Sequence, residues 1–280
     1  MFRPVPLVII TLLTALTAPV TLARPVAAAP SPAIVNVAHR GASADAPENT
    51  LAAFVLARVQ RADVFELDVQ QTSDHRLVLM HDRTLARTTD AERVFPGRAP
   101  WAVGDFTLAE IRRLDAGSWF GSRYEGERVP TLGETLAAMR GSGLGLLLEI
   151  KDPARHPGIE TRVAGELRRH RAWLSAGRVI VQSFDWGSMR RFHQIMPDIP
   201  IGLLGTPEPG RLAALSRYAG LINVPYTDVT RDYVRRIHRY RMRVICWTVD
   251  GQAAMRRLAA YGVDGIVTNR PAVLRRALDR

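Results

Sequence analysis

The sequence predicts an α/β fold, a (β/α)₈ barrel with an extra hairpin strand and an inserted segment. Short apolar runs alternate with amphipathic stretches of helical period, which is typical of a parallel sheet covered by helices. About 250 residues remain after a candidate leader, the usual size of such a barrel. The expected strands are 34–39, 64–69, 77–81, 144–150, 179–183, 201–204, 221–224, 244–248 and 265–268. The expected helices are 51–61, 132–140, 159–170, 187–195, 211–218, 232–240 and 252–261.

Nine strands are one more than the barrel needs. Little more than residues 72–76 separates the second strand from the third, which is too short for a parallel crossover. We therefore expect 77–81 to pair with 64–69 as a hairpin, while the other eight strands close the barrel. Residues 83–130 break the alternation and are expected to form an insertion whose aromatic side chains lie over the barrel mouth, either as a packed flap or as substrate lining.

The N-terminal residues 1–29 have the pattern of a cleaved signal peptide. Arg3 provides a basic start, residues 7–22 are largely apolar, and three alanines end the segment at 27–29. Prolines at 6, 19 and 25 disfavour the alternative, a membrane anchor. We expect a secreted or cell-envelope protein whose single catalytic domain occupies 30–280.

The charge balance is basic, with 38 Lys and Arg against 27 Asp and Glu. The arginines are scattered over predicted helix faces, and no basic helix or aromatic-interleaved patch indicates nucleic-acid binding. Such a surface allows weak contact with an anionic membrane or cell wall, and nothing indicates an obligate protein partner. All but one of the basic residues are arginine; the exception, Lys151, suggests that a compact ammonium is needed at one strand end.

Three carboxylates are expected to converge. Glu66 and Asp68 are two residues apart on a strand and so share a face, as do Glu149 and Lys151 on another strand. Unpaired anions in a half-buried site raise each other's pKa values, and a divalent cation relieves this. All-oxygen ligands favour Ca²⁺ or Mg²⁺ over zinc. The alternative is that Arg40 and Lys151 neutralise the acids and no metal binds.

Two histidines end strands beside these carboxylates. His39 ends the first strand and His81 the hairpin strand, and imidazoles titrate near neutrality, so the two suit an acid–base pair. Asp82 is placed to orient His81. The remaining histidines have no matching partners and are expected at the surface: His75, His156, His170, His193 and His238.

Other strand-end residues are candidates for substrate binding. Arg40 offers a fork and Lys151 a point charge for phosphate oxygens. Trp247 and Phe184 are expected either to cover the substrate or to pack in the core. Asn49 is expected to cap the helix that follows it.

Taken in order along the chain, the motifs resemble those of the glycerophosphodiester phosphodiesterase family. The resemblance covers about residues 35 to 275. The matching segments are His39-Arg40-Gly41, Pro47-Glu48-Asn49-Thr50, Glu66-Leu67-Asp68-Val69, His81-Asp82, Glu149-Ile150-Lys151, Cys246-Trp247-Thr248-Val249-Asp250 and Gly262-Val263-Asp264-Gly265-Ile266-Val267-Thr268-Asn269-Arg270-Pro271. Two positions depart from the family pattern, Arg61 in place of glycine and Asn269 where many members have aspartate. Neither is expected to touch the chemistry.

The resemblance implies metal-dependent hydrolysis of small glycerophosphodiesters, such as glycerophosphocholine, to glycerol 3-phosphate and an alcohol. It implies one divalent cation on Glu66, Asp68 and Glu149, with Ca²⁺ expected ahead of Mg²⁺. It implies His39 and His81 as acid and base, with water or the neighbouring glycerol hydroxyl as nucleophile.

Two other functions are weighed against this one. A phospholipase D-type hydrolase of lysophospholipid or sphingomyelin would need an apolar channel, which residues 95–120 could form. A non-catalytic surface module that binds an anionic polymer would be favoured by loss of a histidine or a metal carboxylate, and none is missing from the motifs.

Overall fold

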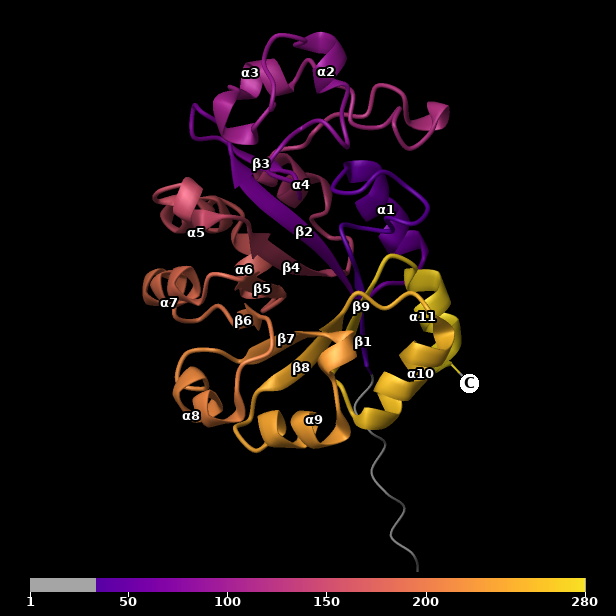
Figure 1. The fold of residues 1–280 in the computed structure, drawn as a ribbon, viewed down its shortest axis with the longest axis vertical. Coiled ribbons are helices and arrows are strands. Elements are labelled where there is room, and N and C mark those ends of the chain that lie inside the picture. Colours follow the sequence, from indigo (N-terminus) through magenta and orange to yellow (C-terminus); the bar gives the residue numbers. More distant parts are fainter. Residues whose placement is uncertain (1–33, 280) are drawn as a thin grey trace, which may run out of the picture. The chain divides into compact units, whose positions relative to one another are not determined.

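In the computed structural model, which describes residues 34–279, the strands form a barrel with helices around its outside (Figure 1). The predicted signal peptide, 1–29, lies outside the described residues. The strands are β1 Val35–Ala38, β2 Val64–Gln71, β3 Leu77–Leu79, β4 Gly145–Ile150, β5 Val179–Ser183, β6 Ile201–Leu204, β7 Leu221–Pro225, β8 Arg243–Trp247 and β9 Gly265–Thr268. The helices are α1 Leu51–Val59, α2 Ala91–Val94, α3 Leu108–Ile111, α4 Leu132–Ala138, α5 Ile159–Arg169, α6 Arg171–Ser175, α7 Trp186–Ile195, α8 Leu212–Leu215, α9 Arg231–His238, α10 Gln252–Tyr261 and α11 Pro271–Leu278.

The barrel closes as predicted. β1 pairs in parallel with both β9 and β2, and the chain of parallel neighbours runs from β9 back through β4 to β2. β2 continues beyond its pairing with β1 and turns into an antiparallel ladder with β3, with Gln71 opposite Leu77. The predicted (β/α)₈ barrel and its extra hairpin strand are therefore confirmed.

Side-chain alternation along the strands separates two apolar layers. On β4, Leu146 and Leu148 pack outward with the helices, while Leu147 packs inward among apolar side chains from the other strands. Glu149 lies on the same inward face as Leu147, two residues nearer the carboxyl end of the strand. The core thus fills the middle of the barrel and leaves polar side chains at its carboxyl-terminal mouth.

The insertion between β3 and α4 has a core of its own. Phe106, Ile111 and Leu114 are fully buried there with Val78 and Met80 of the hairpin, and the ring centroids of Phe95 and Phe106 lie 5.2 Å apart. The insertion is a packed unit above the barrel in Figure 1. Its apolar side chains stabilise the insertion itself.

Several local expectations are wrong. Thr50, not Asn49, caps α1, because the Thr50 hydroxyl accepts a hydrogen bond from the backbone N–H of Ala53. His156 is buried and not at the surface. The terminal helix α11 was not predicted, although Pro271 at its first turn is a start signal. Among residues 34–279, no helix has the length and apolar character needed to cross a bilayer.

Candidate active site

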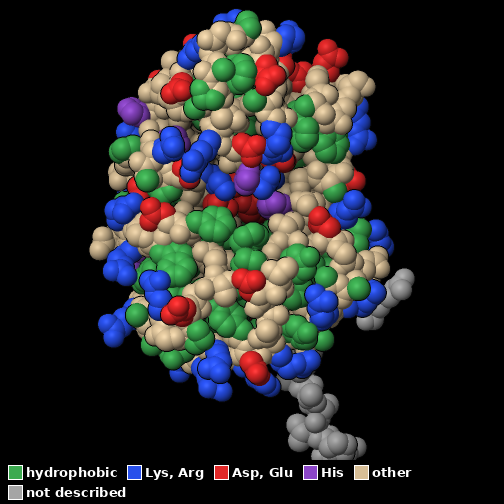
Figure 2. All heavy atoms as spheres, viewed as in Figure 1, with side chains coloured by type: hydrophobic (Ala, Val, Ile, Leu, Met, Phe, Trp, Pro, Cys, Tyr) green, Lys and Arg blue, Asp and Glu red, His purple; other side chains and the backbone are tan. Residues whose placement is uncertain are grey.

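A pocket opens at the carboxyl ends of the barrel strands. Figure 2 shows acidic and histidine side chains in a hollow on this face, with basic side chains around them and apolar ones beside them. The pocket is lined by His39, Arg40, Glu66, His81, Glu149, Lys151, Gln182, Phe184, Leu204, Trp247, Thr248 and Val267. None of these comes from the insertion 83–130, so of the two alternatives for that segment the structure favours the packed flap over substrate lining.

Three buried carboxylates cluster at the pocket, and we call Glu66, Asp68 and Glu149 the acidic trio; Glu66 and Glu149 line the pocket itself. Their side chains are buried, with exposed fractions of 2%, 1% and 7% for the whole residues. One carboxylate oxygen from each lies within 4.8 Å of the others. This all-oxygen donor set fits a hard divalent cation such as Ca²⁺ or Mg²⁺.

The trio resists carrying three negative charges. Burial, together with the charges of Asp68 and Glu149, raises the pKa of Glu66 well above its usual value. Burial and Asp68 also raise the pKa of Glu149 to about 7. For Asp68, burial is outweighed by Arg40 and Lys151, and its pKa is lowered. A cation among the three oxygens would remove this repulsion.

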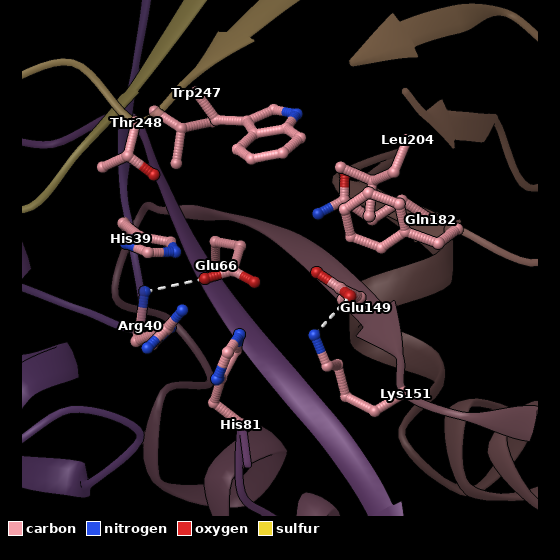
Figure 3. Close-up of a pocket in the computed structure, with 12 residues that line it drawn as sticks. His39, Arg40, Glu66, His81, Glu149, Lys151, Gln182, Leu204, Trp247 and Thr248 are labelled. Carbon is pink, nitrogen blue, oxygen red and sulfur yellow. Dashed lines mark hydrogen bonds and ion pairs between the residues drawn. The ribbon is translucent and has the colours of Figure 1, made fainter. Parts of the chain in front are cut away.

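Two basic side chains flank the trio (Figure 3). The Lys151 ammonium lies 2.8 Å from Glu149 Oε1 and 3.7 Å from Asp68 Oδ1. Arg40 approaches Asp68 Oδ2 to 3.4 Å with its Nε, and its backbone N–H donates to Glu66 Oε2 over 2.7 Å. The ion pairs that formed the alternative to a metal are therefore present, and they coexist with a donor set suited to a cation.

Asn49 also holds Asp68 in place. Its amide nitrogen donates to Asp68 Oδ2 over 2.8 Å, and its amide oxygen accepts from the backbone N–H of Asp68 over 3.1 Å. This two-way contact fixes the rotamer of a trio carboxylate. Sequence reasoning missed it because an asparagine before a helix has the same local pattern as a cap.

His39 and His81 both lie near Glu66 in the pocket (Figure 3). His39 Nδ1 is 2.7 Å from the side-chain oxygen of Asn269. Burial, reinforced by the nearby charge of Arg40, lowers the pKa of His39 to about 4, so the ring is neutral at physiological pH. The expectation that Asn269 lies away from the predicted chemistry is therefore wrong.

His81 is held by a carboxylate, as predicted. Its Nδ1 lies 2.7 Å from Asp82 Oδ1, and Asp82 Oδ2 accepts from Arg87 Nε over 2.6 Å. Arg87 also donates to Glu48 Oε2 over 2.9 Å, and Glu48 Oε1 accepts from Arg40 Nη1 over 2.9 Å. The hydrogen bond with Arg87, followed by that with His81, lowers the pKa of Asp82 to about 2. One ionic chain thus joins a histidine to the arginine beside the trio.

The opposite wall of the pocket is apolar. The rings of Phe184 and Trp247 meet edge to face with centroids 5.7 Å apart. Trp247 is anchored by its Nε1–H, which donates to the backbone oxygen of Asn223 over 2.9 Å. Phe184 is 55% exposed at the rim. Both predicted aromatic residues therefore line the pocket instead of packing only in the core.

Comparisons with known proteins agree with this geometry. The sequence model of the glycerophosphoryl diester phosphodiesterase family matches residues 39–273. A glycerophosphodiester phosphodiesterase of Caldanaerobacter subterraneus subsp. tengcongensis is 38% identical over 242 residues, covering 85% of this chain and 95% of that protein. A glycerophosphodiester phosphodiesterase of Bacillus subtilis is 36% identical over 255 residues, covering 85% of this chain and 84% of its own.

A solved structure supports the same relationship. An Oleispira antarctica phosphodiesterase, in complex with the product sn-glycerol-3-phosphate, superposes with a TM-score of 0.80 at 28% identity, covering 87% of this chain and 96% of that one. Fold, motifs and relatives agree over nearly all of the described residues. The chain belongs to the glycerophosphoryl diester phosphodiesterase family and is a phosphodiesterase of that family.

Proposed function

We propose that the enzyme hydrolyses small glycerophosphodiesters, such as glycerophosphocholine, to glycerol 3-phosphate and an alcohol with the help of one divalent cation. The observation that carries the proposal is the convergence of the acidic trio, two imidazoles and two basic side chains in one pocket. The product held by the Oleispira antarctica relative supports the substrate class.

The acidic trio would hold the cation, with Ca²⁺ proposed ahead of Mg²⁺. Ca²⁺ accepts irregular sets of carboxylate oxygens, whereas Mg²⁺ demands a nearly ideal octahedron. When bound, the cation neutralises charge that develops on the phosphate oxygens. Arg40 and Lys151 would bind the same phosphate group and orient it, the first through a fork and the second as a point charge. The apolar wall of Trp247 and Phe184 would exclude water from one side.

The two histidines would divide the proton transfers. His39, neutral because of burial and Arg40, would accept the proton of the attacking hydroxyl at Nε2. His81, whose Nδ1 contacts the Asp82 carboxylate, would protonate the leaving alcohol. The attacking hydroxyl would belong to water or to the glycerol moiety of the substrate.

The other functions considered from the sequence are not favoured. A phospholipase D-type enzyme for lysophospholipid or sphingomyelin was expected to need an apolar channel from 95–120. Among the described residues, Phe106, Ile111 and Leu114 of that stretch point into the insertion's own core, and none of it lines the pocket. A surface module that only binds polymer would not need two imidazoles in one pocket with a carboxylate cluster.

We also propose that the protein is exported and that its leader is removed between about Ala27 and Ser31, as its small-residue end suggests. N-terminal sequencing of protein from the culture medium or cell envelope should begin within this stretch. A cell-retained chain that still begins at Met1 would contradict export by cleavage.

Metal dependence should appear in both stability and activity. Saturating CaCl₂ should raise the melting temperature, because a ligand at 100 times its Kd adds about 2.7 kcal/mol to the free energy of unfolding. EDTA should abolish hydrolysis of glycerophosphocholine, and Ca²⁺ should restore it. The thermal shift should be larger at pH 8 than at pH 6, because Glu149, with a pKa of about 7, must lose its proton to bind the ion.

Two variants make this test specific. Glu149→Gln should lose the thermal shift, whereas Glu160→Gln should keep it, because Glu160 is an equally buried carboxylate that pairs with Arg191 away from the pocket. An unshifted melting temperature together with EDTA-resistant activity would contradict the metal assignment.

The leaving group should distinguish the two histidines. His39→Ala and His81→Ala should each lower kcat/KM on glycerophosphocholine by about 10²- to 10⁴-fold. A p-nitrophenyl ester of glycerol phosphate needs no protonation of its leaving group, so His81→Ala should recover to within about tenfold of wild type, and His39→Ala should not. His238→Ala, which removes a histidine paired with Asp264, is the control and should keep full activity. Equal losses in both variants on both substrates would contradict the divided roles.

Arg87 should control the acid stability of the site. Arg87→Gln removes the main cause of the low pKa of Asp82, which should rise from about 2 toward its usual value of about 4. A carboxyl whose folded pKa is depressed stabilises the fold above its unfolded pKa, and this stabilisation is lost as the pH falls through the folded pKa. The difference in unfolding free energy between wild type and Arg87→Gln should therefore be present at neutral pH and shrink between about pH 4 and about pH 2.

Urea denaturation across this range measures the effect. Arg93→Gln is the matched control, because it breaks only an exposed pair with Asp90. A pH-independent difference for Arg87→Gln would show that the guanidinium acts by packing instead of by charge.

A further inference from the structure

His39 lies at one end of a relay that leads out of the pocket to solvent. Its Nδ1 contacts the side-chain oxygen of Asn269 over 2.7 Å, and the side-chain nitrogen of Asn269 lies 2.7 Å from Asp250 Oδ2. Asp250 follows β8 and is exposed, whereas Asn269 follows β9 and is half-buried. The relay spans the carboxyl ends of neighbouring strands.

Asp250 Oδ1, the other carboxylate oxygen, already accepts two hydrogen bonds. Asp250 Oδ1 accepts the backbone N–H of Asn269 over 2.9 Å and the hydroxyl of Thr268 over 3.0 Å. The Thr268 hydroxyl donates there, because an ionised carboxylate can only accept, and the hydroxyl oxygen in turn accepts the backbone N–H of Arg270 over 3.0 Å. The Asp250 carboxylate therefore presents its second oxygen, Oδ2, to the side chain of Asn269.

This arrangement determines which way the Asn269 amide faces. An ionised carboxylate has no proton to give, so only the NH₂ group of Asn269 can face Asp250, and the amide oxygen must face His39. The Ser43 hydroxyl lies 2.8 Å from the same amide oxygen and 2.7 Å from the backbone oxygen of His39. Its one proton can go to either acceptor, so the Asp250 carboxylate decides the orientation. Because an amide oxygen only accepts, Nδ1 of His39 must carry the proton, and Nε2 of the neutral ring is left with its lone pair.

We propose that Asp250 is a positioning residue that acts through Asn269 to hold the proton of His39 on Nδ1 and to keep Nε2 free to accept one. Among the described residues, the side-chain hydrogen bonds of Asp250 go to Thr268 and Asn269 and not to the trio or a residue that lines the pocket. The value of the relay for catalysis rests on the base role proposed for His39, but the position of the proton does not, and the two can be measured separately.

The substitution Asp250→Asn should reverse the relay. The backbone N–H of Asn269 still requires an oxygen at the Oδ1 position, so the new NH₂ group must take the Oδ2 position and face Asn269. The Asn269 amide then has to turn over and offer its NH₂ to His39, which must accept at Nδ1 and carry its proton on Nε2. We expect kcat/KM on glycerophosphocholine to fall by at least about 100-fold, through kcat and with little change in KM.

The position of the proton can be observed directly. The ¹⁵N shifts of the His39 ring in labelled protein at pH 7 to 8, assigned by comparison with His39→Gln, should show a protonated Nδ1 in wild type and a protonated Nε2 in Asp250→Asn. The pKa of His39, about 4, keeps the ring neutral in this range.

A second substitution should rescue the first. In Asp250→Asn/Asn269→Asp, the new amide at 250 donates to a carboxylate at 269, which can only accept from His39 Nδ1. The proton should return to Nδ1, and kcat/KM should recover to within about tenfold of wild type. Asp264→Asn is the control for a carboxylate-to-amide change beside a histidine, because Asp264 pairs with His238 and should leave both the His39 spectrum and the rate unchanged.

The outcomes separate the relay from the proposed function. A protonated Nε2 with a lost rate, followed by rescue in the double variant, supports the relay. An unchanged His39 spectrum in Asp250→Asn overturns it, whatever the rate. A displaced proton with an unchanged rate supports the relay and overturns the role of His39 as the base.

Discussion

The repulsion among three buried carboxylates is the constraint on which the rest of the site depends. Asp68 and Glu149 are direct partners in the parallel ladder between β2 and β4, and Glu66 lies two residues before Asp68 on the same face. Backbone register, not side-chain choice, therefore brings these charges together, and no rotamer change can separate them far. The charge has to be balanced by what surrounds the trio, which explains why Arg40 and Lys151 lie against it.

The choice of lysine at 151 follows from the crowding around the trio. Its ammonium is within 4 Å of two trio carboxylates while its side chain remains largely buried. A guanidinium is planar and needs a fork of acceptors, which a compact ammonium does not. Arg40 has that fork, because Glu48 and Asp68 offer oxygens on different sides of its head group. The use of the chain's one lysine here therefore matches the shape of the available space.

Sequence reasoning predicted the features that depend on period and order. Alternation placed Glu66 and Asp68 on one face, and the short link before residue 77 identified the hairpin. It could not predict Asn49 or Asn269 as parts of the site, because their partners are set by where loops after different strands meet. The same holds for Arg87, which lies in an irregular insertion. Local sequence patterns predict which residues form strands and which face they share. Contacts between loops that are distant in sequence depend instead on how the barrel closes.

The surroundings of His39 and His81 differ in the partner of the Nδ1 atom of each ring. His39 Nδ1 faces a neutral amide and its ring lies near Arg40, an environment that disfavours the imidazolium. His81 Nδ1 instead faces the carboxylate of Asp82. The insertion takes part in this difference without lining the pocket, because its Arg87 keeps Asp82 ionised and in place. A segment that adds no atom to the pocket lining can thus hold the carboxylate that orients one of the two pocket histidines.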